Sequence, residues 1–163
     1  MKYSDDLFDV NQDLVMASGI GVLCGLASAF ATISDVGAAY VFISILIGNL
    51  LALKVDGIHH VITLLVFIVI CLIAGIPEMS LAVLLICIFG ALADEVGHEL
   101  ISTVTDNKFL NLFFEYRFVL KIVILLLAIC GAFDFMVFVY FILFEIAYLI
   151  GGIFFEMLDK KRS

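Results

Sequence analysis

Residues 61–101 read VITLLVFIVICLIAGIPEMSLAVLLICIFGALADEVGHELI, and this stretch decides the class of fold. Two apolar runs, 61–77 and 79–101, flank a short break at Pro77-Glu78. A helix needs about 20 apolar residues to cross the hydrocarbon core of a bilayer, whereas the strands of a membrane β-barrel alternate in polarity. The stretch therefore predicts two membrane-spanning helices joined by a tight turn.

The same pattern extends along the whole chain. Of the 163 residues, 65% are hydrophobic and 15% are charged, with no Trp and one Pro. A water-soluble fold of this size has too little interior to bury so much apolar surface. The sequence predicts an all-α polytopic membrane protein, a bundle of six transmembrane helices. The expected spans are 14–33, 36–53, 61–77, 79–101, 118–133 and 135–155.

The basic residues orient this predicted bundle. With six spans, all eight Lys and Arg fall on the side that carries both chain ends. The charged residues of the other side are all acidic. Because cytoplasmic loops carry the excess of Lys and Arg, we expect a plasma-membrane protein with cytoplasmic N- and C-termini. The lipid bilayer is then its main partner. The predicted regions are an acidic cytoplasmic segment, 1–13, a transmembrane domain, 14–155, and a basic cytoplasmic tail, 156–163.

A ridge of small residues in the first span indicates close helix packing. The ridge consists of Ala17, Gly21, Gly25 and Ala29. Small residues at every fourth position let another helix approach closely in lipid. Three partners remain open: a helix of this chain, a second copy in a homo-oligomer, or another subunit of a membrane complex. The span also contains Ala27-Ser28-Ala29, which resembles a signal-peptidase site, but the acidic segment before it favours a retained span.

The sequence argues against several classes of function. No basic patch with interleaved aromatic residues is present, so nucleic acid is not an expected partner. The four cysteines lie inside apolar runs without CxxC spacing, which indicates small buried hydrophobes and not a disulfide set or a zinc site. Motifs of P-loop nucleotide-binding proteins, zinc proteases and serine hydrolases are absent, and no catalytic residue is predicted.

The densest set of ionisable residues lies late in the fourth predicted span. It consists of Asp94, Glu95, His98 and Glu99. At about 100° per residue these four positions fall within about 140° of arc and share one helix face. Three carboxylates and one imidazole could bind a divalent metal ion, whose identity the sequence leaves open. The alternative is a helix that ends here with solvated side chains.

A second candidate cluster lies just after the second predicted span, on the same side of the membrane. Asp56, His59 and His60 offer further metal ligands or a general base near neutral pH. A solvated interfacial loop is the alternative. We expect this cluster to contribute to the same metal site as the face around Asp94.

One carboxylate is predicted to lie deep in the membrane. Glu145 follows Asp134 by 11 residues, which is about 16 Å along a helix and close to mid-bilayer. A charge at mid-helix costs about 3 kcal/mol to insert, which favours a functional or packing role. Glu156 lies on the same side of this helix and extends a polar stripe towards the cytoplasm.

These features predict a small transporter of a cation, either a proton or a divalent metal ion, with a His/carboxylate pocket that faces the cytoplasm. Two alternatives remain open. The first is a metal-dependent membrane enzyme acting on a lipid or isoprenoid phosphate head group, with Lys54 and Arg117 contacting the phosphate. The second is a non-catalytic subunit of a larger membrane complex that docks through the small-residue ridge.

Overall fold

The chain is helical throughout the part that the structure describes. A computed structural model describes residues 2–55, 57–104 and 107–160, and within these ranges it contains eight helices and no strand. In chain order they are α1 (Lys2–Asn11), α2 (Leu14–Ser34), α3 (Val36–Leu51), α4 (Ile58–Ala74), α5 (Leu81–Val104), α6 (Lys108–Glu115), α7 (Phe118–Ile129) and α8 (Phe135–Asp159). The predicted all-α class is confirmed for these residues.

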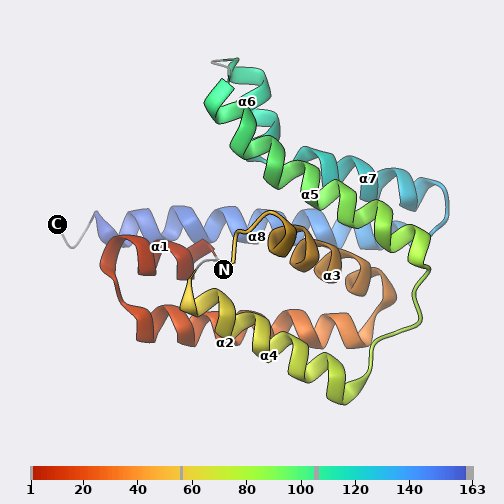
Figure 1. The fold of residues 1–163 in the computed structure, drawn as a ribbon, viewed down its shortest axis with the longest axis horizontal. Coiled ribbons are helices and arrows are strands. Elements are labelled where there is room, and N and C mark those ends of the chain that lie inside the picture. The colour runs from red at the N-terminus through yellow and green to blue at the C-terminus, as the bar shows by residue number, and fades with distance from the viewer. Residues whose placement is uncertain (1, 56, 105–106, 161–163) are drawn as a thin grey trace.

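Six apolar helices run back and forth between two ends of the molecule (Figure 1). One end, which we call the terminal end, carries α1, α6 and the last turns of α8. The opposite end, which we call the hairpin end, carries the short connections at Asp35, 75–80 and 130–134. Neighbouring helices are therefore mostly antiparallel, and residues far apart in sequence meet at the terminal end.

Three helices are long and apolar enough to cross a membrane. These segments, Leu14–Ser34, Leu81–Ile101 and Phe135–Phe155, each have 21 residues. The other apolar helices are shorter, and α7 has only 12 residues. At about 1.5 Å per residue, such a helix spans about 18 Å, less than the hydrocarbon core of about 30 Å. The chain thus has three helices consistent with a membrane protein, and six crossings remain a prediction.

Acidic side chains form turns at the hairpin end. The Ala38 N–H donates to Asp35 Oδ1 at 2.8 Å, and the Met136 N–H donates to Asp134 Oδ1, also at 2.8 Å. Each carboxylate satisfies an N–H that the first turn of a helix leaves unpaired. Gly75, at φ 80°, ends α4 in a conformation that residues with a Cβ rarely adopt. These compact turns explain why the polar breaks between the apolar runs are so short.

The small-residue ridge of α2 packs within the chain. All four of its residues are buried. A Cβ built on Gly25 would lie 2.9 Å from the carbonyl oxygen of Thr63 in α4, and one on Gly21 would lie 2.5 Å from Thr63 Oγ1. At the terminal end, Ala17 packs against Leu7 of α1. The ridge is thus occupied by α4 and α1 of the same chain, and a second copy would have to dock on another surface.

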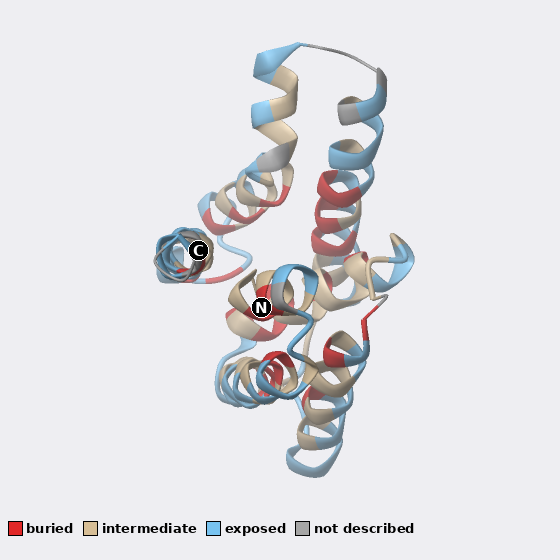
Figure 2. Cartoon of the chain, turned by 90° about the vertical axis from the view of Figure 1, so that its left-hand side faces the viewer, coloured by how far each residue is buried: buried red, intermediate tan, exposed pale blue. Residues whose placement is uncertain are grey.

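The largest hydrophobic core lies between α3, α5, α7 and α8. Its buried members are Tyr40, Val41, Cys87, Ala91, Leu120, Ile124, Ala128, Phe133, Val137 and Phe141. Buried residues face inward and exposed residues face outward in Figure 2. Many outward side chains are large and apolar, such as Leu72 and Ile73 of α4, which are 78% and 82% exposed. An apolar surface of this extent is consistent with a membrane protein.

The contact between α2 and α4 yields a first prediction. Gly25→Ala places a methyl group against a backbone oxygen that cannot rotate away, so we expect a loss of about 1–3 kcal/mol in the free energy of unfolding. Unfolding in mixed detergent micelles measures this loss. Gly19→Ala, on the same helix with nothing within 4 Å of the added carbon, is the matched control and should keep or raise stability. Equal stability of the two variants would contradict the packing argument.

Candidate functional site

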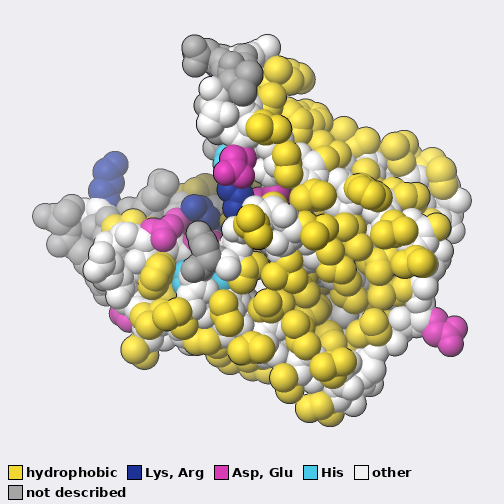
Figure 3. Space-filling view, viewed as in Figure 1, with side chains coloured by type: hydrophobic (Ala, Val, Ile, Leu, Met, Phe, Trp, Pro, Cys, Tyr) yellow, Lys and Arg dark blue, Asp and Glu magenta, His cyan; other side chains and the backbone are white. Residues whose placement is uncertain are grey.

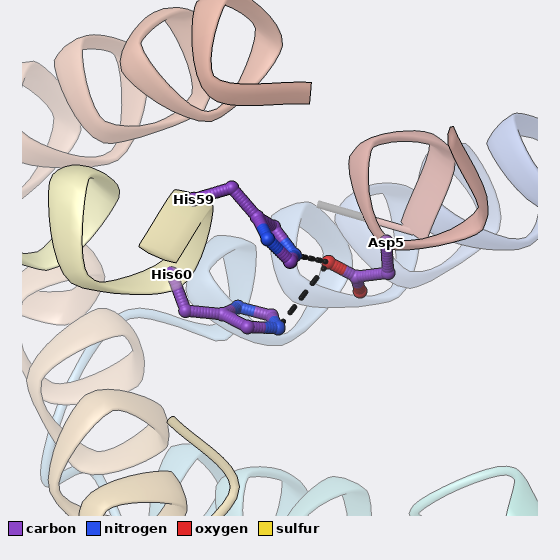
Figure 4. A group of neighbouring side chains, drawn as sticks. All are labelled: Asp5, His59 and His60. Carbon is purple, nitrogen blue, oxygen red and sulfur yellow. Dashed lines mark hydrogen bonds and ion pairs between the residues drawn. The ribbon is translucent and has the colours of Figure 1, made fainter. Parts of the chain in front are cut away.

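Two histidines and one aspartate converge at the terminal end. Asp5 comes from α1, while His59 and His60 lie in the first turn of α4 (Figure 4). Asp5 Oδ1 lies 3.3 Å from His59 Nε2 and 3.5 Å from His60 Nε2. One ligand atom from each residue lies within 4.8 Å of the other two. Among the described residues this triad is the one group of three His, Cys, Asp or Glu side chains placed to hold a metal ion.

The triad is partly shielded from water. His59 is 2% exposed, and its ring lies 4.8 Å from the ring of Phe8 and 4.1 Å from that of His60, between centroids. Its Nδ1 has no hydrogen-bond partner. A Cβ on Gly57 would come within 2.7 Å of that nitrogen, so the ring needs glycine at position 57. Burial raises the pKa of the Asp5 carboxyl, although the neighbouring imidazoles of His60 and His59 act in the opposite direction.

The sequence pointed to His59 and His60 but not to their partner. Asp5 lies 54 residues before His59, in a segment that the sequence described only as acidic. A usable signal was present, because Tyr3 and Leu7 are apolar at helical spacing and predict a helix that packs back on the bundle. The third expected member of this cluster, Asp56, lies outside the residues that the structure describes.

Asp94 caps the start of a neighbouring helix. Its Oδ1 accepts a hydrogen bond from the Val119 N–H at 2.9 Å, and its Oδ2 accepts one from the Leu120 N–H at 2.7 Å. The residue that should cap α7, Arg117, is in the left-handed conformation at φ 49° and makes no side-chain cap. The α5 carboxylate thus takes the place of an ordinary N-cap. Both of its oxygens are engaged with backbone.

Two ion pairs lie beside this cap. Arg117 Nη2 is 2.6 Å from Glu95 Oε1, and Lys121 Nζ is 2.9 Å from Glu145 Oε2. Both carboxylates are buried. The sequence indicated Glu145 as an isolated deep charge, whereas the structure gives it a cationic partner on α7. We call Asp94, Glu95, Arg117, Lys121 and Glu145 the charge cluster.

The structure does not gather the predicted face of α5 into one metal site. Asp94 and Glu95 point to α7, while His98 and Glu99 are exposed on the next turn. Glu99 lies 3.7 Å from Lys54 Nζ. A small cavity of about 10 Å³ beside Asp94 and Glu95 has room for about one water molecule. The side chain of Glu156, predicted to extend the polar stripe, lies outside the described part of the chain.

Similarity to other proteins does not assign a role to these clusters. The chain matches no known protein family, no curated protein and no solved structure. Its function must be inferred from the geometry of the triad and of the charge cluster.

The pairing of Glu145 with Lys121 yields a second prediction. Lys121→Met leaves a buried carboxylate without its cation, so we expect a loss of about 3–5 kcal/mol in the free energy of unfolding. Adding Glu145→Leu removes the orphaned charge and should restore most of that loss. Denaturant titration in micelles measures both, with Lys108→Met, an exposed site, as the control. If the loss in the double variant equals the sum of the losses in the two single variants, the two residues are not coupled.

The capping role of Asp94 yields a third prediction. Asp94→Ala deprives two backbone N–H groups of their acceptor and should destabilise the start of α7 by about 1–3 kcal/mol. Amide hydrogen exchange should quicken at Val119 and Leu120. Glu99→Ala, an exposed change on the same helix, should leave those two amides unaffected. Equal exchange in both variants would rule out the cap.

Proposed function

We propose that the chain is a small integral membrane protein that transports a cation and binds it first at the triad. The observation that carries this proposal is the convergence of Asp5, His59 and His60 at the terminal end. A carboxylate and two imidazoles form a typical site for a divalent cation. The triad is also partly open, since His60 and Asp5 are each about one-fifth exposed at the side chain.

The proposed topology has six crossings, with the terminal end in the cytoplasm. Three helices are long enough by themselves, and α3, α4 and α7 run between the same two ends (Figure 1). The described basic residues all belong to segments of the terminal end: Lys2, Lys54, Lys108, Arg117, Lys121 and Lys160. On the face in Figure 3, basic side chains gather towards that end, and hydrophobic ones cover the rest. This distribution supports a cytoplasmic terminal end, and bilayer thinning accommodates the shorter helices.

Polar groups continue from the triad into the bundle. Tyr148 of α8 interacts electrostatically with Asp5 of the triad and with Arg117 and Glu95 of the charge cluster. Its ring also lies under Arg117, at 5.7 Å from the guanidinium carbon. Glu145 follows about one turn deeper on the same helix. Ionisable groups inside a membrane protein tend to mark ion paths, and this series supports a path that begins at the triad.

The alternative of a phosphate-binding membrane enzyme has less support. The two cations expected to hold the phosphate both have carboxylate neighbours: Arg117 pairs with Glu95 at 2.6 Å, and Lys54 lies 3.7 Å from Glu99. A phosphate would have to displace those carboxylates. The subunit alternative relied on the small-residue ridge, which is covered by helices of the same chain.

Transport yields a fourth prediction. Purified chain in liposomes should take up Zn²⁺, followed with an indicator dye inside the vesicles, and His59→Ala should lower the initial rate at least about tenfold, the effect of losing about 1.4 kcal/mol of ion binding. His98→Ala removes an exposed histidine outside the triad and is the matched control. Parallel measurements with a pH dye test whether protons move as well. Uptake by the His59→Ala variant at the wild-type rate would contradict the proposed entry site.

A further inference from the structure

The triad atoms are farther apart than the atoms of a charge-assisted hydrogen bond usually are, and their spacing is close to that of metal ligands. Hydrogen bonds to charged partners are about 2.7–2.9 Å long, whereas the two Nε2-to-Oδ1 distances are 3.3 and 3.5 Å. In a tetrahedral site with bonds of about 2.0–2.1 Å, neighbouring ligand atoms stand about 3.3–3.4 Å apart. The two separations of Asp5 Oδ1 from the imidazole nitrogens thus match those expected around a four-coordinate ion, and the third separation lies within 4.8 Å.

A second observation concerns the hydrogen bonding of the two ring nitrogens of His59. His59 is 98% buried, and its Nδ1 has no hydrogen-bond partner. Its single polar engagement is therefore made by Nε2, which points to the centre of the triad (Figure 4). Asp5 Oδ1 pairs with both histidines, while the nearest lysine, Lys2, forms its ion pair with Asp6 at 2.8 Å. A cation between the three side chains would bind this half-buried carboxylate more directly than the neutral imidazoles do.

The chemistry of the ligands narrows the class of ion. Imidazole nitrogens suit Zn²⁺, Cu²⁺, Ni²⁺ and Co²⁺, whereas Mg²⁺ and Ca²⁺ prefer sites made of oxygen ligands. Three protein ligands leave one tetrahedral position open, as in metal sites that exchange a ligand and unlike closed structural sites. The partly exposed His60 and Asp5 give an incoming ion access to the open position.

The ligands come from two helices that each pack mainly on other helices, and whose other described contact is the Phe8 ring beside His59. α1 packs on α2, where the Ser4 hydroxyl donates to the Ala17 carbonyl at 2.8 Å, and on α8, where the rings of Tyr3 and Phe155 meet in a T-shaped arrangement. α4 packs mainly on α2. An ion held by Asp5 and the two histidines would therefore join α1 directly to α4 across the terminal end.

We propose that the triad is a four-coordinate site for a late first-row divalent metal ion, and that the bound ion fastens α1 to α4. This inference rests on the proposed function, because it names the ion class and a structural consequence of the same site. Loading of the site then adds a third attachment to those that α2 and α8 already give α1 at the terminal end. The open fourth position is filled by water or by a ligand that arrives with the ion.

The first test measures metal binding by the full chain in detergent. Metal-free protein is titrated with ZnCl₂, CoCl₂, MgCl₂ and CaCl₂, and bound metal is counted after dialysis. We expect one Zn²⁺ or Co²⁺ per chain, intense visible absorption of four-coordinate Co²⁺, and no competition from Mg²⁺ or Ca²⁺.

Asp5→Asn and His60→Ala should each weaken Zn²⁺ binding at least about tenfold. Asp6→Asn, the neighbouring aspartate that pairs with Lys2, and His98→Ala should bind as wild type.

The second test measures the attachment of α1. Zn²⁺ should slow amide hydrogen exchange in Lys2–Asn11 of the wild type and of Asp6→Asn, but not in His60→Ala. The inference is overturned by no stoichiometric binding, by equal competition from Mg²⁺, by a six-coordinate Co²⁺ spectrum, or by exchange in α1 that is indifferent to Zn²⁺. Zn²⁺ bound as expected without uptake into liposomes would overturn transport alone. Uptake of Mg²⁺ or protons by protein that does not bind Zn²⁺ would overturn the metal site alone.

Discussion

The close approach of α2 and α4 determines where the candidate site can form. Gly21 and Gly25 allow the α4 backbone to lie directly on α2, and the carbonyl oxygen of His59 is within 3.2 Å of where a Gly21 Cβ would be. That contact fixes the first turn of α4 at the terminal end, beneath α1. A larger residue at either glycine would move both imidazoles away from Asp5. The geometry of a polar site thus depends on two positions that carry no chemistry themselves.

Inside the bundle, the buried carboxylates restrict how the helices can pack. Buried carboxylates in an apolar surrounding need a cation or several hydrogen-bond donors, and this chain uses both. Glu95 and Glu145 have Arg117 and Lys121, and Asp94 has two backbone N–H groups of α7. The first turn of α7 and the residue before it therefore supply the cations and the N–H donors for carboxylates of α5 and α8. This arrangement ties α7 to both neighbours and makes the start of α7 the meeting point of the polar interior.

The local sequence pattern predicted the positions of the helices well but the contacts between distant residues poorly. The continuous apolar runs and their acidic breaks indicated helices close to those observed, because hydrophobicity and turn formation are properties of neighbouring residues. The number of crossings is still a prediction, since α7 is shorter than a bilayer core. The partner of His59 depended on α1 folding back over 54 residues. The role of Asp94 depended on a left-handed Arg117, which no spacing rule indicates.

The brevity of α7 has a consequence for ions. In the proposed topology, a helix of 12 residues draws the two lipid interfaces together around it. Water would then reach closer to the membrane centre on this side of the bundle than elsewhere. The electrostatic self-energy of an ion depends on how much low-dielectric material it must cross, so the barrier is lowest beside α7. In that topology Lys121 and Glu145, paired at 2.9 Å, would lie where the membrane is thinnest and where a hydrated cation would have the shortest dry distance to travel.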